Sequence, residues 1–126
     1  MKLGDFTELA HAYINRPAYS QDIINAILNY AKLEKDTIRV ADIGAGTGKL
    51  TKVLLEMGIS VDAVEPNEEM RNEGIIYTKD FDVKWSKGSG EETGLESGKY
   101  DWVVMASSFH WTNPTKSLPE FNKLLK

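Results

Sequence analysis

A glycine-rich turn, Gly44-Ala45-Gly46-Thr47-Gly48, is the feature that most constrains how this chain folds. The β-branched run at 38–43 directly precedes it and is typical of a short strand. After the turn, apolar residues recur at three-to-four spacing up to Gly58, where we expect a helix to end. Small residues let the backbone turn sharply and let a ligand approach the unpaired N–H groups that begin a helix. The pattern therefore predicts a strand, a ligand-accessible turn and a helix in succession.

The alternation of strands and helices continues along the chain. Residues 59–64 are again rich in β-branched side chains and are followed by Asn67, which is placed to cap a helix. A weaker strand is expected over 82–86, and a strand that is apolar on both faces over 102–106. Such alternation predicts an α/β fold with a parallel sheet, in which ligands bind beyond the carboxyl ends of the strands.

Three further helices are expected around this sheet. Apolar residues at helical spacing predict helices over 6–15 and 20–35, with Ser20 as the N-cap of the second. A last helix over 114–126 is expected to place four apolar residues on one side: Leu118, Phe121, Leu124 and Leu125. Pro119 fits that helix only near its first turn, because a proline further inside removes a backbone hydrogen bond.

Composition narrows the class of protein. A chain of 126 residues has room for one domain of ordinary size. With no cysteine, disulfide frameworks, thiolate nucleophiles and thiolate zinc sites are excluded, and two histidines make a metal site a poor expectation. A formal net charge of −4 without charged blocks argues against nucleic acid as the partner. We expect no membrane span and no secretory signal, and hence a cytoplasmic protein.

Three kinds of nucleotide site compete for the glycine turn. A phosphate-binding loop would need Gly at position 43 and Ser or Thr at position 50, where this chain has Ile43 and Leu50. A dinucleotide fingerprint is weakened by Lys49, which stands where Gly or Ala is wanted. Glu65, 19 residues after Gly46, suits the hydroxyls of a ribose. An adenosine ligand without a strong need for a pyrophosphate fits these residues best, although a tight turn without a ligand stays open.

Several motifs together resemble the class I S-adenosylmethionine-dependent methyltransferases. They are the segment 40–48, then Val64-Glu65-Pro66-Asn67, and then Tyr100-Asp101-Trp102-Val103-Val104. The chain is most similar to the small-molecule branch, in which segments like Tyr13-Ile14-Asn15-Arg16-Pro17, Gly88-Ser89-Gly90-Glu91 and Phe109-His110-Trp111 recur. The resemblance implies one domain over 1–126, with a helical preface at 1–36 and a Rossmann-like core at 37–126. That core would have about four strands and lack the C-terminal strands of the family.

The resemblance also implies a site for S-adenosyl-L-methionine, and the composition leads us to expect no metal. Asp42 would orient the methionyl amino group, the glycine turn would line the amino-acid and ribose portion, and Glu65 would take the ribose hydroxyls. The other cofactor-binding candidates follow later strands: Pro66, Asn67, Ser89, Gly90, Glu91, Ala106 and Ser107. Candidates on the substrate side are Tyr13, Arg16, Tyr19, His110 and Trp111. His110 is the one candidate base, and packing between its aromatic neighbours explains it as well.

Two functions of different class follow. The first is methyl transfer to an unidentified small-molecule acceptor, and the second is a catalytically silent S-adenosylmethionine-binding fragment or interaction module. An NAD-dependent oxidoreductase is a third and weaker alternative. In the family the strand at 102–106 is covered by a fifth strand that this sequence does not contain. Because proteins seldom leave an apolar edge bare, we expect self-association, for example as a dimer, through that edge.

Overall fold

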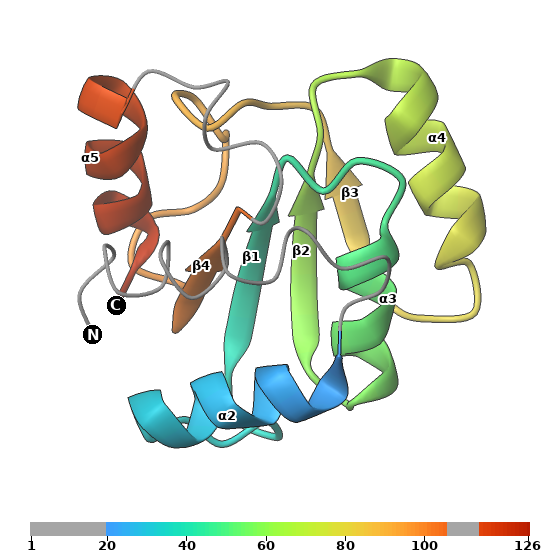
Figure 1. Cartoon of the computed structure of the whole chain (residues 1–126). Helices are drawn as coiled ribbons and strands as arrows, with labels where there is room; N and C mark the ends of the chain where they lie inside the picture. Colours follow the sequence, from blue (N-terminus) through green and yellow to red (C-terminus); the bar gives the residue numbers. More distant parts are fainter. Residues whose placement is uncertain (1–19, 106–113) are drawn as a thin grey trace.

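Four strands of the computed structural model, which describes residues 20–105 and 114–126, form a parallel sheet in the order β3-β2-β1-β4. The strands are β1 (Arg39–Ile43), β2 (Ser60–Val64), β3 (Lys84–Ser86) and β4 (Trp102–Val104). The helices are α2 (Gln21–Ala31), α3 (Lys49–Glu56), α4 (Glu68–Tyr77) and α5 (Pro114–Leu124). Figure 1 shows helices on both sides of the sheet, which confirms the predicted Rossmann-like α/β fold.

Two helices begin at the residues that the sequence predicts. The Ser20 side chain accepts a hydrogen bond from the backbone N–H of Asp22 at 3.2 Å, and α2 starts at the next residue. The Asn67 side chain likewise accepts a bond from the N–H of Met70 at 2.9 Å and caps α4. Such caps satisfy donors that have no partner inside the helix. The helix α2 ends earlier than expected, because Lys32 adopts a left-handed conformation with φ of 56°.

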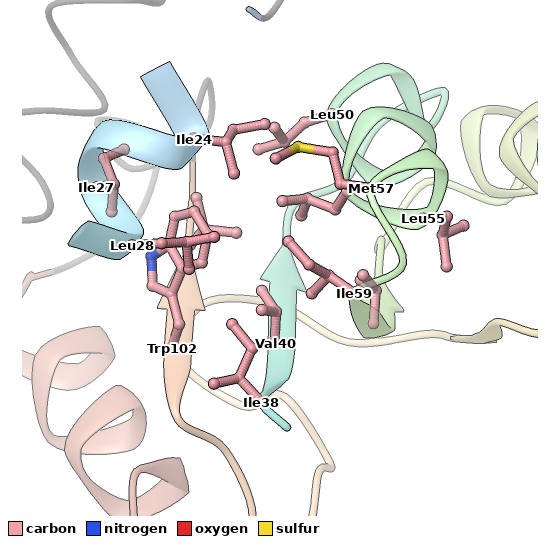
Figure 2. Packing of buried hydrophobic residues seen from close by; sticks show 13 residues of the cluster. Ile24, Ile27, Leu28, Ile38, Val40, Leu50, Leu55, Met57, Ile59 and Trp102 are labelled. Atoms are coloured by element: carbon pink, nitrogen blue, oxygen red, sulfur yellow. The ribbon is translucent and has the colours of Figure 1, made fainter. Parts of the chain in front are cut away.

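A hydrophobic cluster fills the space between the sheet and the pair α2 and α3. Figure 2 shows Leu28 of α2 beside Trp102 of β4, and Ile24 of α2 beside Leu50 of α3, while Val40 of β1 belongs to the same cluster. Side chains on a strand alternate between its two faces, so Val40 and Trp102 face this cluster together. The helix α2 therefore shares the core of the sheet, and the single domain over 1–126 expected from the sequence stays a prediction.

The opposite face of the sheet packs against α5, and here two predictions are wrong. Over 116–124, the part of α5 whose side chains the structure describes, the buried positions are Ser117, Phe121 and Leu124, which recur at helical spacing, while Leu118 is 37% exposed. Leu118 follows Ser117 by one residue and therefore lies about 100° around the helix from the buried stripe. Pro119 lies in the second turn rather than the first, so α5 lacks one of its usual backbone bonds.

The strand β4 lies at one edge of the described sheet, and the end of the chain comes beside it. Leu125 forms a parallel bridge with Tyr100, just before β4. The N–H of Tyr100 donates to the carbonyl of Leu124, and the N–H of Lys126 donates to the carbonyl of Tyr100, both at 3.0 Å. The segment after α5 therefore pairs with the residue before β4, on the edge of the sheet. Self-association through the rest of this edge stays a prediction.

In the part of the chain that the structure describes, no helix has the length and apolar character needed to span a membrane. The cytoplasmic location expected from the sequence stays a prediction.

Candidate functional site

The turns that follow β1 and β2 meet at the carboxyl ends of these two neighbouring strands, and Glu65 joins them. One carboxylate oxygen of Glu65, Oε1, accepts a hydrogen bond from the backbone N–H of Gly46 at 2.8 Å. The other, Oε2, accepts one from the N–H of Asn67 at 2.9 Å. Glu65 is only 5% exposed. The residue predicted to bind a ribose therefore also holds both turns in place.

The glycine turn adopts the backbone conformation that its residue types permit. Gly46 and Gly48 have φ values of 61° and 86°, a region that side-chain-bearing residues rarely adopt. The N–H groups of Gly44 and Ala45 both donate to the carbonyl of Val64, at 2.8 and 3.0 Å. These bonds fix the beginning of the turn to the end of β2. The turn predicted to approach a ligand is thus held by backbone bonds as well as by Glu65.

Asp42 lies one residue before the end of β1 and is 2% exposed. The hydroxyl of Thr51, in the first turn of α3, donates to Oδ2 of Asp42 at 2.6 Å. Burial raises the pKa of Asp42 to about 7, and the nearby charge of Glu65 acts in the same direction, while the bond from Thr51 opposes the rise. Buried carboxylates with shifted pKa values are typical of functional sites.

The loop after β3 carries the third group of predicted residues. The N–H of Glu65 donates to the carbonyl of Ser86 at 3.1 Å, so this loop starts beside Glu65. The loop is then closed by a turn in which the N–H of Ser89 donates to the carbonyl of Glu92 at 3.0 Å. The Ser89 hydroxyl in turn accepts a bond from the N–H of Glu92 at 3.2 Å. In this turn Gly90 is buried and Glu91 is half-buried.

A glutamate on α5 holds the end of that loop, and the sequence analysis missed it. Glu120 accepts hydrogen bonds from the N–H of Thr93 at 3.0 Å and from its hydroxyl at 2.5 Å. Burial alone would raise the pKa of Glu120, but the bonds from Thr93 and the charge of Lys123 outweigh it and lower that pKa. The local signal for this role was that Glu120 is a charged residue next to buried Phe121 on an amphipathic helix.

Trp85 is a second residue that the sequence analysis missed. Its ring lies against Gly48 of the glycine turn and Gly74 of α4, and its Nε1 donates to the Thr78 hydroxyl at 3.0 Å. A Cβ on Gly48 would lie 3.1 Å from the Cζ2 atom of Trp85. Trp85 therefore supports the far side of the glycine turn. The local signal is Gly74 itself, because a glycine inside a helix often marks close packing.

The structure brings together the candidates that follow β1 and β2, and it leaves others untested. Asp42, the glycine turn and Glu65 lie at one end of the sheet, where the strand arrows point in Figure 1. Pro66 and Asn67 are exposed beside them, and the Asn67 side chain is engaged as the cap of α4. Seven candidates lie outside the described residues: Tyr13, Arg16, Tyr19, Ala106, Ser107, His110 and Trp111.

Comparison with known proteins defines the class. A model of the methyltransferase domain family matches residues 41–126, and the chain therefore belongs to this family. An uncharacterised methyltransferase of Mycobacterium tuberculosis is 35% identical over 111 residues, which are 88% of this chain and 43% of that protein. An uncharacterised methyltransferase of Geobacillus is 36% identical over 133 residues, covering 98% of this chain and 62% of its own length.

A solved structure agrees with these sequences. A SAM-dependent methyltransferase from Aquifex aeolicus superposes with a TM-score of 0.70 at 26% identity, over 81% of this chain and 57% of that one. The resemblance to class I S-adenosylmethionine-dependent methyltransferases is thereby confirmed. The chain spans less than half of the length of its mycobacterial relative.

Proposed function

We propose that this domain binds S-adenosyl-L-methionine at the carboxyl ends of β1 and β2 and takes part in methyl transfer to a small-molecule acceptor. The observation that carries the proposal is the buried carboxylate of Glu65, which bonds the turns after both strands. A carboxylate at the end of the second strand suits the hydroxyls of a ribose. Each oxygen of Glu65 accepts one bond from the backbone and has further acceptor capacity for a ligand.

The residues that surround Glu65 fit the other parts of such a cofactor. The glycine turn lets a ligand lie close to the backbone, because Gly46 and Gly48 adopt positive φ values that bend the chain sharply after β1. Asp42 is a buried carboxylate, and a cationic group such as an ammonium stabilises its ionised form. These residues would bind the nucleoside at one end and the amino-acid portion at the other.

Methyl transfer from this cofactor mainly requires that the protein position the methyl donor and the acceptor. The cofactor supplies an activated methyl group on a sulfonium, which leaves by in-line displacement when an acceptor is held in near-attack geometry without competing water. A general base is needed only for a hydroxyl or an acidic carbon as acceptor. His110, the candidate base, lies outside the described residues, so the class of small molecule is left open.

Calorimetric titration with S-adenosylmethionine and S-adenosylhomocysteine tests binding. We expect micromolar affinity for the unmodified chain and a loss of at least about tenfold in Glu65→Ala, because a charged hydrogen-bond acceptor is removed. Glu68→Ala, an exposed acidic neighbour in the first turn of α4, is the matched control and keeps the affinity. Circular dichroism and urea unfolding of Glu65→Ala establish that the variant is folded.

The outcomes separate the candidate functions. If the unmodified chain binds neither ligand, the proposal is overturned for this chain. Binding of nicotinamide dinucleotides in competition with S-adenosylmethionine would support the oxidoreductase instead.

A second candidate function is a silent S-adenosylmethionine-binding module. Transfer of a labelled methyl group to a panel of amines, carboxylates and hydroxyls distinguishes the two. Binding without any transfer would favour the silent module, and transfer would exclude it.

A further inference from the structure

Thr51 is a polar residue at a position where the core would accept an apolar one. It is 0% exposed, and its neighbours on α3, Leu50, Leu54 and Leu55, are buried hydrophobic residues. The hydroxyl of Thr51 donates to Oδ2 of Asp42 at 2.6 Å, across the space between α3 and β1. Burying a hydroxyl is unfavourable unless it is hydrogen-bonded. The bond to Asp42 therefore accounts for a hydroxyl at position 51, which is surrounded on α3 by buried leucines.

The bond leaves the Asp42 carboxylate with acceptor capacity to spare. An ionised carboxylate has about four lone-pair sites on its two oxygens. Among the described residues, Thr51 is the donor that bonds this side chain, and the bond goes to Oδ2. Asp42 lies one residue before the carboxyl end of β1, beside the glycine turn. The carboxylate of Asp42 is held through Oδ2, and Oδ1 is therefore suited to accept a hydrogen bond from a ligand.

We propose that Thr51 is a positioning residue of the cofactor site, whose hydroxyl holds the Asp42 carboxylate so that Oδ1 faces the ammonium group of the bound methionyl moiety. This inference rests on the proposed function. Without the hydroxyl, the carboxylate is able to rotate about its own side-chain bonds and loses the orientation that the ligand needs. A preorganised group binds more tightly because its orientation is fixed before the ligand arrives.

The charge of Asp42 supports the same role. Burial and the charge of Glu65 favour the protonated form of Asp42, and the bond from Thr51 favours the ionised form. Only the ionised form attracts an ammonium group. Removal of the hydroxyl should therefore raise the pKa of Asp42 further and narrow the pH range in which the cofactor binds.

Two substitutions at position 51 separate the hydroxyl from the shape of the side chain. Thr51→Val has nearly the same shape and no hydroxyl, and Thr51→Ser keeps the hydroxyl and loses a methyl group. The probe is S-adenosylhomocysteine, whose Kd is measured by calorimetry between pH 6 and pH 9. We expect Thr51→Val to weaken binding about tenfold at pH 7.5, as for the loss of a hydrogen bond to a charged group. Thr51→Ser should stay within about threefold of the unmodified chain.

The pH dependence and a second ligand exclude a merely structural role. In Thr51→Val the pH at which half of the affinity is lost should rise by about one unit, because the ionised carboxylate has lost a donor. Methylthioadenosine lacks the carboxylate and ammonium groups of the methionyl moiety. Its affinity should be the same in Thr51→Val as in the unmodified chain, because Asp42 has nothing to bind in it.

Each result has one meaning. If the unmodified chain does not bind S-adenosylhomocysteine, the proposed function fails. If it binds and Thr51→Val binds equally well with the same pH profile, the function stands and the role of Thr51 is overturned. If Thr51→Val loses both ligands to the same extent, Thr51 only maintains the packing of α3, and the positioning role is again overturned.

Discussion

The indole ring of Trp85 on β3 lies so close to Gly74 on α4 that a Cβ on this glycine would overlap it. Thr78 links the two residues. Its hydroxyl donates a hydrogen bond to the carbonyl of Gly74 at 2.8 Å and accepts one from Nε1 of Trp85. Gly74 is also the buried residue of α4. The closeness of α4 to the sheet therefore depends on the absence of a side chain at this position.

Gly74→Ala should destabilise the protein, although alanine is the better helix former. The new methyl group must displace the Trp85 ring or push α4 away from β3, and such overpacking costs about 1–3 kcal/mol. Urea unfolding followed by circular dichroism measures the change. Asn72→Ala, at an exposed position of the same helix, is the control and should be neutral or slightly stabilising. A Gly74→Ala variant as stable as the unmodified chain would contradict the contact.

A charged pair, in which Asp62 is buried and Arg39 is partly exposed, joins β1 to β2 at the other end of the sheet, and Tyr100→Phe tests it. Arg39 donates to both oxygens of Asp62, at 2.7 and 3.0 Å, and the hydroxyl of Tyr100 donates to Oδ2 of Asp62 at 2.6 Å. Burial and the charge of Asp62 raise the pKa of Tyr100, so its hydroxyl stays protonated. Loss of this hydroxyl should lower the free energy of unfolding by about 1–3 kcal/mol, because the buried Asp62 side chain loses a hydrogen-bond donor.

Tyr30→Phe is the matched control, since Tyr30 is largely exposed. Its urea midpoint should not change. Equal midpoints for Tyr100→Phe and the unmodified chain would show that the hydroxyl contributes nothing net to stability.

Asp42→Asn should make the unliganded protein more stable at alkaline pH. Burial raises the pKa of Asp42 from 3.8 to about 7, so the folded state binds a proton more tightly than the unfolded state. The contribution of this group to stability is therefore full below pH 3.8 and is lost as the pH rises to about 7. Asparagine cannot ionise, and its advantage over aspartate should grow by about 1–3 kcal/mol between pH 5 and pH 8.

Urea unfolding of both chains at these two pH values measures that difference. An advantage that does not change with pH would show that Asp42 is not the group responsible. If Asp42 accepts the ammonium group of the ligand as proposed, S-adenosylhomocysteine should stabilise the unmodified chain more than Asp42→Asn.

Much of the fold was predictable because the signals for its elements are local. The β-branched run before the glycine turn, the helical spacing after it and the caps Ser20 and Asn67 depend on residues that are neighbours in the sequence. The glycine turn and Glu65 were found in the same way, since their spacing follows from a strand, a turn and a helix of ordinary length. The helix α5 is present as predicted, but its predicted buried face was wrong. Which face a helix buries depends on the surface against which it packs, and here Ser117 is buried while Leu118 is exposed.

By itself the sequence determined the order of the elements, the parallel α/β class and the place of the glycine turn, because each depends on local backbone preference and hydrophobic period. Only the tertiary structure decided which side chains meet across those elements. The register of β1 against β2 brought the Gly46 N–H to Glu65, and the packing of α3 on β1 brought Thr51 to Asp42. Partners that lie far apart in the chain, such as Thr93 and Glu120, carry no sequence period that marks them as a pair. Their contacts arise only when the sheet and its helices come together, because each bond is directional and forms at one relative placement of the two elements.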